Sequence, residues 1–82
     1  MIDTHTARAF LLNKYQGAWS AFYYAGTAGI VQSFDHLREE CAKVTAPGLA
    51  EWIEYQAQNA PQRKTFFGGT YWLLPWSSEK RD

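Results

Sequence analysis

Residues 63–74 read RKTFFGGTYWLL and contain the clearest structural signal in the sequence. Two glycines, Gly68 and Gly69, separate two runs that are rich in aromatic and β-branched side chains. Paired glycines supply the positive φ angles that a two-residue hairpin turn requires, so these residues predict a β-hairpin. The expected register places Phe67 opposite Thr70, Phe66 opposite Tyr71 and Thr65 opposite Trp72.

Both faces of this hairpin are expected to carry aromatic rings, because side chains alternate along a strand. One face would hold Phe66, Tyr71 and Leu73, and the other Phe67, Trp72 and Leu74. Two short helices can cover only one of these faces. We expect the face with Trp72 to be core and the face with Tyr71 to be exposed for association, since exposed aromatic clusters mark contact sites.

Two helices are expected before the hairpin. Over residues 35–44, Leu37, Cys41 and Val44 fall on one stripe, and Ser33 or Asp35 can cap the first amides. A second helix is expected over residues 47–59, where the apolar stripe repeats and Pro61 follows soon after the last residue.

The N-terminal third admits two interpretations. As strands, it forms a meander over Arg8–Tyr15, Ala18–Ala25 and Ile30–Phe34, because its many rings suit a pleated surface. As a helix, it forms an apolar stripe that Gly17 interrupts at a cost of about 1 kcal/mol. The stripe consists of Ala7, Leu11, Tyr15, Ala18 and Phe22. We prefer the strands.

The expected fold class is therefore α+β. A small antiparallel sheet, made of the N-terminal meander plus the C-terminal hairpin, packs with two helices in a single domain over residues 1–82. A chain of this length buries only roughly 60 to 65% of its unfolded surface. The four Trp, five Tyr and five Phe provide the large apolar areas that such a small core needs.

Charge and cysteine content exclude several classes of protein. Eight basic residues balance eight acidic ones, so no net field attracts the whole molecule to nucleic acid or to an anionic membrane. The single Cys41 cannot form an internal disulfide, and the first residues lack the pattern of a secretory signal. No apolar run approaches the roughly 20 residues that span a bilayer. We expect a cytoplasmic location and no membrane partner.

No motif supports catalysis or cofactor binding. Of the candidate metal ligands His5, His36, Glu40 and Cys41, only His36 and Glu40 lie one helical turn apart, and two ligands do not make a site. Cys41 lies on an apolar stripe, where a thiol usually packs. The serines belong to no nucleophile motif. We expect no enzyme activity, no metal, no cofactor and no small-molecule substrate.

DNA binding is the alternative function that we weigh. If the N-terminus is helical, three helices precede a hairpin, which is the layout of a winged helix-turn-helix, with residues 44–47 as the turn and Arg63 and Lys64 in the wing. The residues of the recognition helix, 49–58, include Glu51 and Glu54 and no Arg or Lys, so this helix would repel phosphates. Nucleic acid is therefore the weaker alternative.

A non-enzymatic protein-binding module is the leading hypothesis. Residues 35–54 contain five acids and two bases, which suits contact with a basic partner surface. The partner would be a host complex, inhibited in the manner of anti-CRISPR proteins by a phage or mobile-element product, or a second copy in a homodimer. The candidate contact residues are Phe66, Tyr71, Leu73, Trp76, Glu51 and Glu54.

Overall fold

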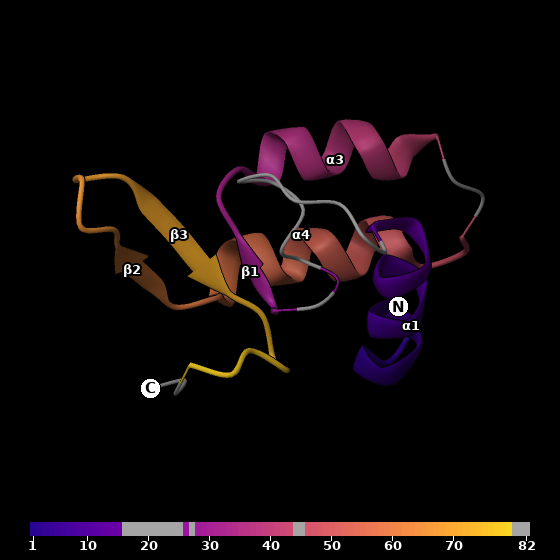
Figure 1. The fold of residues 1–82 in the computed structure, drawn as a ribbon. Helices are drawn as coiled ribbons and strands as arrows, with labels where there is room; N and C mark the ends of the chain where they lie inside the picture. The colour runs from indigo at the N-terminus through magenta and orange to yellow at the C-terminus, as the bar shows by residue number, and fades with distance from the viewer. Residues whose placement is uncertain (16–25, 27, 44–45, 80–82) are drawn as a thin grey trace.

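The structure is a computed structural model that describes residues 1–15, 26, 28–43 and 46–79 (Figure 1). Its elements are α1 (Thr4–Tyr15), β1 (Ile30–Val31), α3 (Phe34–Ala42), α4 (Leu49–Asn59), β2 (Gln62–Lys64) and β3 (Thr70–Leu73). Helices and a three-stranded antiparallel sheet make up a small α+β fold, which confirms the predicted class. Among the described residues, no helix has the length and apolar character needed to cross a membrane.

The expected strand over Arg8–Tyr15 is wrong, because these residues belong to helix α1. Asp3 caps this helix: its carboxylate accepts a hydrogen bond from the Thr6 amide at 2.7 Å. Ala7 and Leu11, one turn apart, are both buried. A capped start and a buried helical stripe outweigh the preference of aromatic rings for strands.

The other two strands of the expected meander have different outcomes. Ala18–Ala25 lies outside the described residues. Ile30–Phe34 is a strand only at Ile30–Val31, since Phe34 already begins α3. Among the described residues, the N-terminal contribution to the sheet is therefore this two-residue strand.

Helices α3 and α4 confirm the two predicted helices with shorter bounds. Ser33 caps α3, because its hydroxyl oxygen accepts a hydrogen bond from the His36 amide at 3.2 Å. Helix α4 begins after Gly48, whose φ of +84° lies in the left-handed region. A Cβ at Gly48 would lie 2.9 Å from Cγ2 of Ile2, so both backbone conformation and packing against the chain start require glycine here.

Strand β3 is the centre of the sheet, whose order is β1-β3-β2. The hairpin prediction is confirmed, but its register is wrong: Tyr71 lies opposite Arg63 and not opposite Phe66. The strands stop pairing at Lys64 and Thr70, so the connection is a five-residue loop instead of a two-residue turn. Consequently Phe66 and Phe67 lie in the loop and on neither face of the sheet.

The core lies between the helices and the sheet. Among the described residues, the buried members of the core cluster are Ala7, Leu11, Val31, Phe34, Leu37, Cys41, Leu49, Trp52, Ile53 and Leu74. Leu73, the last residue of β3, and Leu74, which follows the strand, are both completely buried. Leu73 was expected on the open face with Tyr71, and this expectation is wrong at Leu73.

Replacing Leu11 with Ala tests the packing of α1 on the core. Leu11 is 1% exposed, so Leu11→Ala should lower the free energy of unfolding by about 2 to 5 kcal/mol through lost burial and a cavity. The matched control is Ala9→Ser on the exposed side of the same helix, which should change stability by about 0.5 kcal/mol or less. Urea denaturation followed by circular dichroism measures both, and equal effects would show that α1 does not pack on the core.

Candidate functional site

The loop between β2 and β3, residues 65–69, is called the hairpin tip and is held by its own hydrogen bonds. The Thr65 amide donates to the Gly69 carbonyl at 2.8 Å, and the Gly68 amide donates to the Thr65 carbonyl at 3.1 Å. The Thr65 hydroxyl oxygen also accepts from the Gly69 amide at 2.8 Å. Gly68 has φ +89°, a conformation that L side chains rarely adopt. The tip is therefore a preformed loop.

The hairpin tip presents two phenylalanine rings to solvent. Phe66 is 96% exposed and Phe67 is 93% exposed, and their ring centroids lie 5.3 Å apart in an edge-to-face arrangement. Phe67 was expected on the core face beside Trp72, and this expectation is wrong. The missed signal is Thr65, whose hydroxyl completes a loop longer than the glycine pair suggests. These rings take no part in the core, so they are available for contact.

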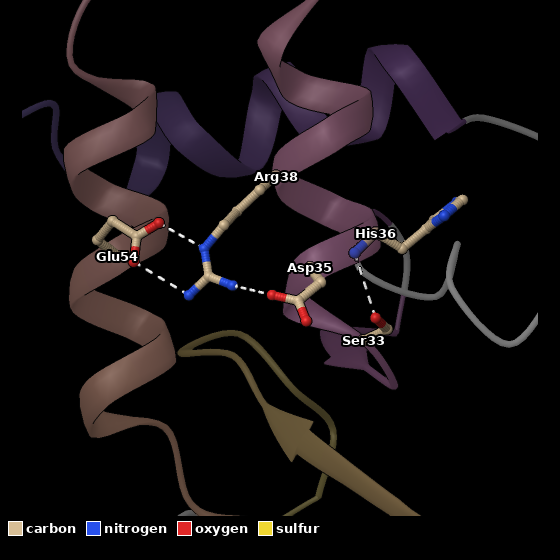
Figure 2. A network of polar contacts seen from close by, with 5 residues as sticks. All are labelled: Ser33, Asp35, His36, Arg38 and Glu54. Carbon is tan, nitrogen blue, oxygen red and sulfur yellow. Dashed lines mark hydrogen bonds and ion pairs between the residues drawn. The ribbon is translucent and has the colours of Figure 1, made fainter.

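Arg38 joins α3 to α4 through an exposed ion-pair network (Figure 2). Its Nε and Nη2 donate to the two carboxylate oxygens of Glu54 at 2.5 and 3.0 Å, and its Nη1 donates to Asp35 at 2.5 Å. The hydrogen bond from Arg38 lowers the pKa of Glu54, and the same bond raises the pKa of Arg38. The negative charge of Glu54, a predicted contact residue, is therefore already paired with Arg38 of the same chain.

A hollow of about 290 Å³ lies between α3 and α4 and is called the α3–α4 hollow. Leu49, Ile53 and Cys41 supply apolar walls, and Arg38 and Glu54 lie at its edge. Three alanines that end at Cβ leave the space open, and sequence analysis missed it. The sequence signal that could have indicated the hollow is a set of alanines spaced four residues apart: Ala42, Ala46 and Ala50.

The remaining predicted contact residues lie apart from the tip. The Tyr71 hydroxyl donates to Glu79 at 2.9 Å, which raises the pKa of Tyr71. Trp76 is half-buried and stacks on Trp52 with ring centroids 5.6 Å apart, whereas Leu73 is completely buried. The expectation that Leu73 shares an exposed face with Phe66 and Tyr71 is therefore wrong.

Glu51 and Trp72 occupy different environments. Glu51 is exposed in the first turn of α4, where the helix dipole favours a carboxylate. Trp72 is half-buried and meets Phe34 edge-to-face at 5.4 Å. Of the predicted contact residues, only Phe66 combines nearly full exposure with a large apolar side chain.

The residues weighed for chemistry have structural positions. Cys41 is buried in the core, and the Ser33 hydroxyl caps α3. Within the described part of the chain, no group of three or more His, Cys, Asp or Glu side chains is placed to hold a metal ion. Cys41 therefore packs in the core, and Ser33 caps a helix.

Comparisons with known proteins give no family or relative for this chain. No family model matches it, and no curated protein or solved structure is significantly similar to it. Inferences about function therefore depend on the geometry of the chain itself.

Replacing Glu54 with Gln should remove part of the pH dependence of stability. Because the pKa of Glu54 is lowered in the folded state, its stabilising contribution is present above the unfolded pKa and is lost as the pH falls through the folded pKa. The control, Glu51→Gln, removes a carboxylate from the same helix without touching Arg38. Between about pH 7 and about pH 3, Tm should fall less in Glu54→Gln than in wild type or the control. Identical falls in all three proteins would contradict the role of the Arg38 contact.

Proposed function

We propose that this chain is a small, non-enzymatic protein-binding module whose contact surface is the hairpin tip. The observation that carries the proposal is the exposure of 96% and 93% at Phe66 and Phe67 on a loop closed by its own hydrogen bonds. Exposed aromatic rings cost hydration free energy unless a partner covers them. Because the loop is preformed, binding orders little additional chain.

The charges near the tip favour a protein partner over a membrane or a nucleic acid. Lys64 and Arg63 precede the tip, whereas the exposed side of α4 carries Glu51 and Glu54. A molecule with both signs on its surface suits a partner with a complementary mixture of charges. The proposal has two narrower forms: the partner is either a host complex that the chain inhibits as anti-CRISPR proteins do, a class suggested by its size and aromatic content, or a second copy of the chain.

Photo-cross-linking tests the proposal whatever the partner is. A chain with benzoylphenylalanine in place of Phe67, expressed in its native cells, should form cross-links to protein on irradiation. The control carries the same group in place of Ala9, which is exposed on α1. Mass spectrometry identifies the cross-linked species. If position 67 gives no more cross-linked protein than position 9, the tip is not a protein contact and the proposal fails.

Winged helix-turn-helix DNA binding is the second candidate, and the order of elements favours it. Helices α3 and α4 pack together and are followed directly by the β2–β3 hairpin, as in that layout. Against it, the exposed residues of α4 include no Arg or Lys that could neutralise phosphates. They are Ala50, Glu51, Glu54, Tyr55, Gln58 and Asn59.

A gel-shift titration separates the two candidates. On the protein-binding proposal we expect no shift of duplex DNA even at roughly 50 mM salt, where phosphate-driven binding is strongest. The comparison variant is Lys64→Glu, in the strand that leads to the tip. Binding that weakens steeply towards about 200 mM salt, and that this variant reduces, would replace the protein-binding proposal with the DNA-binding one.

A further inference from the structure

We infer that the partner of the hairpin tip is a second copy of the same chain, and that the tip of one copy seats in the α3–α4 hollow of the other. This inference rests on the proposed function, because it names the occupant of the same contact surface. It comes from two features of one molecule that complement each other in shape and in charge: a projecting apolar pair and an open apolar hollow.

The tip has the form of a rigid projection. Figure 1 shows the β2–β3 loop extending beyond the helices, away from α1. Phe66 and Phe67 lie edge-to-face with their ring centroids 5.3 Å apart. Three hydrogen bonds within the loop fix the backbone beneath them. Little backbone entropy therefore remains to be lost when the rings are covered.

The α3–α4 hollow has the size and lining to accept an aromatic ring. An apolar cavity of about 150 Å³ accepts benzene in an engineered protein. The hollow here measures about 290 Å³ and is lined by Leu49, Ile53 and Cys41. Ala46 and Ala50 keep it open, because their side chains end at Cβ. A phenyl ring can therefore enter without displacing the core.

The charges around the two surfaces are opposite. Arg38 and Glu54 pair with each other at the edge of the hollow, and Asp35, one helical turn away on α3, pairs with the same guanidinium, so this network beside the hollow has one negative charge in excess. Glu51 adds a second exposed carboxylate beside Ala50. The strand leading to the tip ends in Lys64, which is exposed. Opposite charges of this kind speed association and favour one docking orientation.

The area available fits a small reciprocal dimer. One phenylalanine side chain buries about 150 to 250 Å², and the surface that it covers loses at most a similar area. If each copy places one ring in the hollow of the other, the two contacts bury at most about 1,000 Å² in total, which is the size of a weak, concentration-dependent interface. Such an arrangement is isologous and closes after two copies, so it does not lead to open filaments.

Sedimentation velocity over a concentration series tests the inference with two kinds of variant. Phe66→Ser with Phe67→Ser removes the projection, and Ala50→Trp fills the hollow from an exposed helix position. Each should raise the dimer dissociation constant at least about tenfold. Ala50→Gln is a second hollow variant with a smaller side chain. Thermal melts show whether each variant keeps its fold, and only folded variants are compared.

Mixing the two variants is the decisive measurement. The tip variant keeps an intact hollow and Ala50→Trp keeps an intact tip, so an equimolar mixture should recover one of the two contacts and form a heterodimer. Neither variant should dimerise alone. A wild type that stays monomeric, or a mixture that recovers nothing, overturns the inference. Cross-links from position 67 to a different protein alone would also overturn it while leaving the proposed function intact.

Discussion

The fold depends on the burial of Trp52, the largest completely buried side chain among the described residues. Its indole N–H donates to the Thr4 hydroxyl at 3.4 Å, and its ring stacks on Trp76. It therefore connects the start of the chain, helix α4 and the segment after β3. A domain this small has little other apolar area with which to hold these three segments together. Because Trp76 follows β3, the same contact joins the end of the hairpin to α4.

Local signals were sufficient to predict α3 and α4. Both helices combine an apolar stripe with a recognisable start, and Ser33 caps the first as expected. The N-terminal helix was harder, because the residues of Arg8–Tyr15 suit both a strand and a helix, and we preferred the strand. The deciding residue is Asp3, outside that stretch, whose carboxylate binds the Thr6 amide. The hydrogen bond from the Thr6 amide also lowers the pKa of Asp3.

The hairpin was predicted correctly as an element, but its register and the faces assigned to its aromatic rings were wrong. The pair Gly68-Gly69 fits a two-residue turn and also the end of a five-residue loop, and only the hydrogen bonds of Thr65 distinguish them. The longer loop moves Phe66 and Phe67 off the strands, so the alternation rule no longer assigns them to faces. The α3–α4 hollow has a similar origin. Its alanines belong to two helices and their connection, and only their relative packing turns three small residues into a cavity.

The ion pairs of Arg38 reduce the number of carboxylates in residues 35–54 that can contact a basic partner. Arg38 engages Glu54 through two nitrogens, so a carboxylate that seemed available for a basic partner already has one within the chain. The remaining exposed acids can steer a partner but supply little binding free energy, since exposed charges are screened by water and salt. On the proposed function, apolar contact provides the affinity, and the tip holds the two most exposed rings among the described residues. The loop closes through backbone and threonine hydrogen bonds, so its closure does not depend on contacts of these rings.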